Sequence, residues 1–125
     1  MKPVRPAASA KEASLAAALE ALQGNRPLRA EEICRAYLES SPGCVEHLRL
    51  LGNSLSKQGR YAEAEQTVRL ANSLQPDFPH LHEDLGSVLA LQQRFEEAVP
   101  CFERAIQIEP RLPLAHKKLG QALAA

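Results

Sequence analysis

The sequence has few aromatic residues and no net charge. It contains no Trp, two Tyr and three Phe, so the core must be built mainly from Leu and Ala, which favour helices over sheets. Fifteen basic residues balance fifteen acidic ones, and no overall field would draw the chain to nucleic acid or to an anionic membrane. These absences argue against an all-β fold and against binding to nucleic acid or to membrane.

The sequence also lacks the patterns that mark disulfide frameworks, metal sites, membrane spans and common catalytic motifs. Cys34, Cys44 and Cys101 are odd in number and show no CxxC spacing, which indicates a reducing compartment. No stretch reaches the apolar length of a bilayer span, and no phosphate-binding Gly-Lys-Ser loop, Gly-x-Ser-x-Gly elbow or His-Glu-x-x-His helix occurs. The sequence therefore predicts a soluble, cytoplasmic, non-enzymatic protein with no metal and no cofactor.

What the chain does contain is a repeat of 34 residues. Each period holds two stretches of helical apolar spacing separated by a short turn, which predicts an antiparallel helical hairpin. Gly inside a helix costs roughly 1 kcal/mol relative to Ala, so the recurring glycines and alanines indicate that the two helices approach closely. The predicted packing residues are Leu51, Gly52, Ala64, Leu85, Gly86, Ala98, Leu119 and Gly120.

The repeat resembles the tetratricopeptide repeat (TPR) family, whose pattern places Leu-Gly in a first helix and Ala, an aromatic residue, Ala and Pro in or after a second. The second period has Leu48-x2-Leu51-Gly52, and the third has Leu85-Gly86 followed by Ala98-x3-Phe102. The first repeat is degenerate, and the fourth stops after its first helix. The resemblance implies an all-α superhelix of three helix-turn-helix repeats plus one further helix. The chain is expected to consist of a flexible tail over 1–10 and a TPR domain over 11–125. The repeats of that domain are expected at about 11–44, 45–78 and 79–112, with a partial repeat at 113–125.

The resemblance also implies a function. In TPR proteins the first helices of the repeats line a concave groove that holds an extended peptide or a partner helix. We therefore expect a protein–protein interaction module whose partner is a protein or peptide. After the packing residues are removed, the first helices offer a polar set of mixed sign as candidate partner-binding residues: Arg49, Asn53, Lys57, His80, Glu83, Ser87, Lys117 and Gln121.

Two recognition devices of the family are incomplete in this sequence. A clamp for a partner's terminal carboxylate is matched by Arg49, Asn53 and Lys118. Asp84 occupies its middle Asn slot, however, where it would repel a carboxylate, and Leu114 replaces a basic residue. The Asn ladder of some glycosyltransferase relatives is missing, because its slots hold Ala16, Leu50, Asp84 and Lys118.

Two other functions stay open, as does the direction of one apolar stripe. Residues 30–38 and 47–52 resemble the N-terminal repeat arms fused to bacterial sulfotransferase or glycosyltransferase domains, so the chain could serve as the recruiting or scaffolding arm of a larger transferase. A second copy could instead cover the apolar stripe of the last helix in a homodimer. In the degenerate first repeat, Leu15, Leu19 and Leu22 face either the groove or the core.

Overall fold

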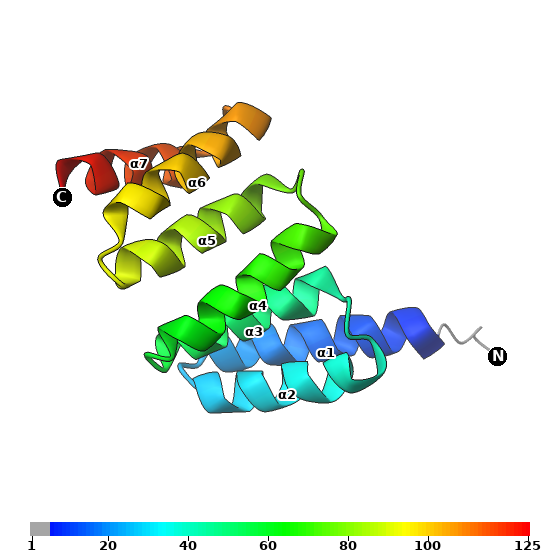
Figure 1. The fold of residues 1–125 in the computed structure, drawn as a ribbon. Coiled ribbons are helices and arrows are strands. Elements are labelled where there is room, and N and C mark those ends of the chain that lie inside the picture. Colours follow the sequence, from blue (N-terminus) through cyan, green and yellow to red (C-terminus); the bar gives the residue numbers. More distant parts are fainter. Residues whose placement is uncertain (1–5) are drawn as a thin grey trace.

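The computed structural model describes the backbone of residues 6–125, and these residues form helices and no strand (Figure 1). The predicted all-α fold is confirmed. Four of the helices begin with Pro, which fits the first turn of a helix because its missing N–H needs no partner there. The helices are α1 (Pro6–Gln23), α2 (Pro27–Ser40), α3 (Val45–Lys57), α4 (Tyr61–Leu74), α5 (Pro79–Leu91), α6 (Phe95–Ile108) and α7 (Pro113–Ala124).

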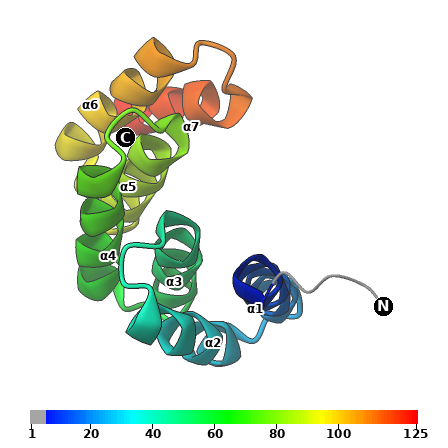
Figure 2. The ribbon, with the colours of Figure 1, turned by 90° about the vertical axis from the view of Figure 1, so that its right-hand side faces the viewer.

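Consecutive helices pack against each other and build a curved stack. Figure 2 shows α1, α3, α5 and α7 on the inner side of the curve and α2, α4 and α6 on the outer side. Helix α3 also contacts α1 and α5, and α5 contacts α7, so neighbouring repeats touch along the inner side. This arrangement confirms the predicted superhelix of three hairpins followed by one further helix. Within residues 6–125, no helix combines the length and the apolar character needed to cross a bilayer.

The first helix is longer than the sequence predicted. We expected a tail over residues 1–10, but α1 begins at Pro6, so the prediction is wrong for residues 6–10. The physical reason is that Pro is favourable in the first turn and that the segment after it is rich in Ala, the strongest helix former. The remainder of the predicted tail, residues 1–5, lies outside the described residues.

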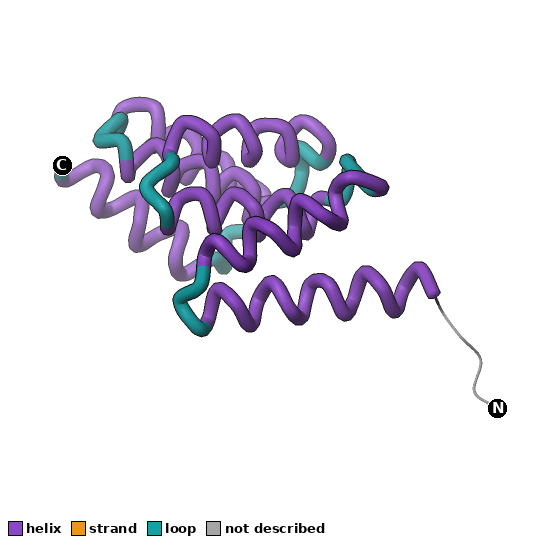
Figure 3. Tube along the Cα trace, turned by 90° about the horizontal axis from the view of Figure 1, so that it is seen from below, coloured by secondary structure: helices purple, strands orange, loops and turns teal. Residues whose placement is uncertain are grey.

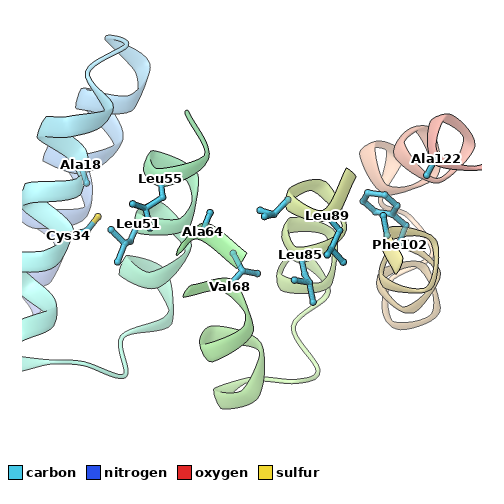
Figure 4. Packing of buried hydrophobic residues seen from close by; sticks show 12 residues of the cluster. Ala18, Cys34, Leu51, Leu55, Ala64, Val68, Leu85, Leu89, Phe102 and Ala122 are labelled. Carbon is cyan, nitrogen blue, oxygen red and sulfur yellow. The ribbon is translucent and has the colours of Figure 1, made fainter. Parts of the chain in front are cut away.

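The main hydrophobic core is a layer of side chains that runs through the whole stack (Figure 4). Every helix contributes, and burying one Leu, Val or Phe side chain stabilises the fold by about 1.5–3 kcal/mol. The hairpins therefore share one continuous apolar layer. One buried residue from each helix in turn is Ala18, Cys34, Leu51, Val68, Leu85, Phe102 and Ala122.

The interior glycines mark the close helix crossings of the second and third repeats. A Cβ at Gly52 would lie 2.9 Å from Val68 Cγ2, and one at Gly86 would lie 2.6 Å from Phe102 Cε1. Gly120 occupies the equivalent slot in α7, yet a Cβ there would meet no atom of the described chain within 4 Å. The predicted packing role of Gly120 is wrong, because no helix of the described chain covers that face of α7.

The turns inside the hairpins also repeat. Asn25, Gly59 and Gln93 all take left-handed backbone conformations, with φ of 58°, 78° and 62°. The residue after each of them donates its backbone N–H to a carbonyl of the preceding helix, for example Arg60 to Leu55. These short loops (Figure 3) join the two helices of each hairpin through the same backbone conformation. Gly adopts such a φ without strain, and Asn tolerates it.

Half-buried ion networks join the hairpins on the outer side. The Glu31 carboxylate of α2 accepts hydrogen bonds from Arg60 Nη1 at 2.7 Å and from Gln58 Nε2 at 3.0 Å. Burial alone would raise the pKa of Glu31, but hydrogen bonds from Gln58, Arg35 and Arg60 outweigh it and lower the pKa to about 2. The next repeat has the same arrangement, formed by Glu65, Gln92 and Arg94.

Candidate functional site

A groove of about 680 Å³ runs along the inner side of the stack and is lined by residues of α1, α3, α5 and α7. Its floor is periodic, because each repeat contributes equivalent positions to it. One row consists of Leu19, Asn53 and Ser87. The other row has one residue per repeat and consists of Ala16, Leu50, Asp84 and Lys118, the four slots of the missing Asn ladder.

Much of the groove surface is apolar. Leu15 and Leu19 of α1 line it together with Leu91 of α5, and Leu19 and Leu91 are 47% and 51% exposed. Leu22, the third residue of the α1 stripe, is buried beside Ala21 instead. The stripe therefore divides, with two leucines facing the groove and one facing the core. Exposed leucines gathered in a concave surface are a common feature of binding sites.

The most prominent charged groups of the groove pair with each other across the repeat boundary. Arg49 Nε of α3 lies 2.7 Å from Asp84 Oδ2 of α5, and Arg49 Nη2 lies 3.4 Å from Asp84 Oδ1. The Arg49 guanidinium also sits 5.5 Å from the centre of the Phe78 ring, a distance that permits a cation–π interaction. Arg49 is therefore held by the chain's own carboxylate rather than left free for a ligand.

Lys118 links α7 to α5 in a similar way. Its Nζ donates a hydrogen bond to Ser87 Oγ at 2.8 Å and lies 3.8 Å from the Glu83 carboxylate. Glu83 is only 6% exposed, so it serves this contact and not the open groove. The late basic residue of the clamp pattern is thus also engaged within the chain.

The groove brings together part of the predicted site. Arg49, Asn53 and Ser87 line it, and Gln121 lines an adjoining pocket of about 330 Å³ that shares Ser87 and Lys118 with the groove. The other four residues of the predicted set line neither the groove nor the adjoining pocket. These four are Glu83, Lys117, Lys57 and His80. Lys57 is exposed at the end of α3, and the His80 ring packs edge-on against the Phe78 ring.

Two of these residues, Glu83 and Lys117, are displaced for the same physical reason. Successive residues of a helix point about 100° apart, so a register error of one residue turns a side chain away from the groove. In α5 the groove residue is Asp84 rather than Glu83, and in α7 it is Lys118 rather than Lys117. The expectation that Glu83 and Lys117 face the groove is therefore corrected by one position.

Sequence reasoning also missed several apolar groove residues. Leu50, Phe78 and Leu91 line the groove but were absent from the predicted set, which kept mainly the polar residues of each first helix. The repeat itself carried the signal for Leu50, because that residue belongs to the row of Ala16, Asp84 and Lys118. Phe78 lies before α5 in a loop, where helical periodicity has no bearing.

Among the side chains that the structure describes, no three His, Cys, Asp or Glu residues come together in a way that could hold a metal ion. The groove therefore offers apolar surface, hydrogen-bonding groups and internally paired charges. These are means of binding a partner.

A curved stack of helical hairpins with a periodic groove on its inner side defines the chain as a helical-repeat protein. Family models agree with this class: the tetratricopeptide repeat model matches residues 15–77, and a TPR repeat model matches residues 86–125. The chain belongs to the tetratricopeptide repeat family.

Solved structures similar to the chain include one longer protein and two peptide complexes. A mutant O-GlcNAc transferase of Thermobaculum terrenum is 32% identical, with a TM-score of 0.88 over 98% of this chain and 23% of that one. The second TPR domain of human RPAP3 in complex with an HSP70 peptide is 18% identical, with a TM-score of 0.80 over 92% of each chain. A type III secretion chaperone of Yersinia enterocolitica, SycD, in complex with a peptide of the translocator YopD, is 14% identical, with a TM-score of 0.82 over 93% of this chain and 94% of that one.

The chain thus spans about a quarter of the length of the transferase that it resembles. A search of curated proteins found no significant match.

Proposed function

We propose that the chain is a protein–protein interaction module that binds an extended peptide or a partner helix in the groove. The observation that carries the proposal is the groove itself, about 680 Å³ in volume and lined by equivalent positions of successive repeats. A periodic groove suits a periodic ligand, because a peptide segment presents side chains at regular intervals. The peptide complexes of the RPAP3 domain and of SycD, which share the fold, support peptide binding by this chain. TPR repeats are typically non-catalytic, and we propose no catalysis by the groove.

The groove chemistry indicates how such a peptide would be recognised. Because Arg49 is paired with Asp84 and Lys118 with Ser87 and Glu83, a terminal carboxylate would have to displace an existing ion pair. The exposed Leu19 and Leu91 side chains need no such exchange. We propose that apolar side chains of the partner provide most of the affinity and that polar groove residues such as Asn53 set its register.

The test is a selection of peptides from a random displayed library on the folded chain, followed by affinity measurements with variants. Leu19→Glu places a charge in the groove and should weaken the selected peptides by at least about tenfold, or roughly 1.4 kcal/mol. The matched control is Leu70→Glu, since Leu70 is 48% exposed on α4 and lies outside the groove lining. Peptides that bind both variants as well as the original chain would contradict the proposal.

A second candidate function is the arm of a larger transferase. The specific observation is the 32% identity over 98% of this chain with the O-GlcNAc transferase. In that role the same groove would recruit protein substrates for a separate catalytic domain. Determining the coding sequence that follows Ala125 tests the idea: a transferase domain in the same reading frame supports it, and a stop codon directly after Ala125 contradicts it.

Self-association through α7 is the third proposal. Leu123 is 65% exposed, and the Gly120 face of α7 is open within the described chain. Light scattering at high concentration should show a dimer that Leu123→Glu converts to a monomer. A monomer before and after the substitution would exclude it.

A further inference from the structure

A cluster of reactive side chains lies away from the groove, where α1 meets the start of α3. Cys44 Sγ is 3.0 Å from His47 Nδ1, and the other ring nitrogen, His47 Nε2, is 2.9 Å from Ser14 Oγ of α1. The His47 ring is fully buried and stacks on Tyr37, with ring centres 3.9 Å apart. The imidazole is therefore held rigidly, with one nitrogen on a hydroxyl and the other on a thiol.

This geometry suits the transfer of a proton from sulfur to nitrogen. Burial lowers the pKa of His47, so the ring is neutral near pH 7 and can carry its proton on only one nitrogen. If Nε2–H donates to Ser14 Oγ, the lone pair of Nδ1 faces the thiol and can accept its proton. Ser14 thus orients the ring as the third member of a nucleophile–base–orienter set does.

The surroundings of the sulfur bear on the thiolate that such a transfer would create. Cys44 is the N-cap residue of α3, where the partial positive charge of the helix N-terminus stabilises an anion. The Cys44 thiol can also donate a hydrogen bond to the Glu46 carboxylate, 3.6 Å from the sulfur. This carboxylate opposes a thiolate, and it is itself paired with Lys11 Nζ of α1 at 2.9 Å. Tyr37, which stacks on the His47 ring, and Cys34, whose pKa the charge of Cys44 raises further, are the other titratable groups near the site.

The other two cysteines have no comparable partner. Cys34 is fully buried, and burial raises the pKa of its thiol to about 11. Cys101 is half-buried, and its thiol donates to the Glu97 backbone carbonyl at 3.5 Å, while burial raises its pKa. Cys44 alone among the three combines partial exposure with a neighbouring base.

We propose that Cys44 is a site of reversible thiol–disulfide exchange with low-molecular-weight disulfides, with His47 as its proton acceptor. The Cys44 S–H bond breaks and its proton passes to His47 Nδ1. The thiolate attacks one sulfur of the small disulfide R–S–S–R, a new S–S bond forms as the old one breaks, and the leaving R–S⁻ takes the proton from Nδ1. One disulfide is consumed and one is formed, so the step needs no other oxidant.

The test uses the whole folded chain and two small disulfides, 5,5′-dithiobis(2-nitrobenzoate) and oxidised glutathione. Rates are followed across a range of pH, and peptide mapping identifies the modified cysteine. We expect Cys44 to react first with both disulfides. His47→Gln should slow the reaction at pH 7 by at least about tenfold, as the loss of a general base does, and should change the shape of the pH profile. His82→Gln is the matched control and should change neither.

Modification of Cys101 as fast as Cys44, or a His47→Gln variant that reacts at the original rate, would overturn the proposal. If circular dichroism shows that His47→Gln does not fold, Ser14→Ala decides instead, because it removes only the hydroxyl that orients the ring. We expect Ser14→Ala to slow the reaction by about threefold with the fold intact. An unchanged rate and pH profile in that variant would overturn the proposal equally.

Discussion

The third and fourth repeats carry the same Leu-Gly pair in their first helices and surround it differently. In α5, Gly86 faces the ring of Phe102, which a Cβ would approach to 2.6 Å. In α7, the equivalent Gly120 faces open space. One sequence motif thus occupies a closed crossing in one repeat and an open surface in the next. The comparison shows that a repeat residue has its packing role only where the second helix of its own hairpin is in place.

The second and third repeats, in which the second helix of the hairpin covers the interior glycine, also provide most of the groove. Asp84 and Ser87 of α5 and Arg49 and Asn53 of α3 hold fixed positions because their helices are packed on both sides. Helix α7 supplies Lys118 to the groove and leaves its far face uncovered. Preorganised side chains bind with a smaller entropy cost, so we expect the middle of the groove to contribute more to affinity than its α7 end.

The largest change in stability is expected from adding a methyl group at the tight crossing of α5 and α6. Gly86→Ala would drive a methyl group into the buried Phe102 ring, and such overpacking costs about 3 kcal/mol. Urea denaturation should show this loss. In a chain that already carries Phe102→Val, Gly86→Ala should cost less, because the added methyl group would no longer meet the ring atoms of Phe102. A Gly86→Ala variant as stable as the original chain would break the comparison.

A smaller loss of stability is expected when the ion network that joins the hairpins is broken. Glu31→Gln leaves Arg35 and Arg60 without their shared carboxylate and should cost about 2 kcal/mol at pH 7. The folded pKa of Glu31 is about 2, below its ordinary value of 4.5. The carboxylate therefore stabilises the fold above pH 4.5, and this stability is lost as the pH falls toward 2.

The pH dependence provides the control for this prediction. Denaturation at several pH values should show that the Glu31→Gln variant loses less stability between about pH 5 and pH 2 than the original chain. Glu39→Gln changes an exposed carboxylate of the same helix and should leave the curve unaltered. Equal acid sensitivity in the original chain and the Glu31→Gln variant would contradict the assigned role of the network.

A substitution in the turn of the third repeat should raise the stability of the fold rather than lower it. Gln93 adopts φ of 62°, where the second repeat has Gly59. Gln93→Gly removes the strain of a left-handed side-chain-bearing residue and should raise stability by about 1 kcal/mol. Thermal unfolding compared with Gln92→Gly, which loses hydrogen bonds to Glu65 and Arg94, tests the sign. A Gln93→Gly variant that melts below the original chain would show that the turn is not strained.

The fold could be predicted from the sequence because every repeat needs the same small and apolar residues. Leu51, Gly52, Leu85 and Gly86 recur at a spacing of 34 residues, which is the period of the tetratricopeptide repeat. The start of α1 could not be predicted in the same way, because residues 6–10 precede the repeat pattern and depend on local helix propensity alone.

The groove was only partly predictable, for two physical reasons. Groove residues differ in chemistry from repeat to repeat, so their residue types do not reveal a register error of one position, such as Glu83 for Asp84. The pairing of Arg49 with Asp84 joins two repeats, and a sequence pattern does not report contacts of that kind. The orienting contact between Ser14 and His47 is equally long-range.

The smallest expected effect tests the comparison most directly. Gly120→Ala adds a methyl group where the described chain leaves open space, and Ala is the better helix former, so urea denaturation should show a gain of about 0.5 kcal/mol. The same assay should show a loss for Gly86→Ala. Opposite signs for these two substitutions are what the account predicts. A loss of stability in Gly120→Ala comparable to that in Gly86→Ala would contradict it.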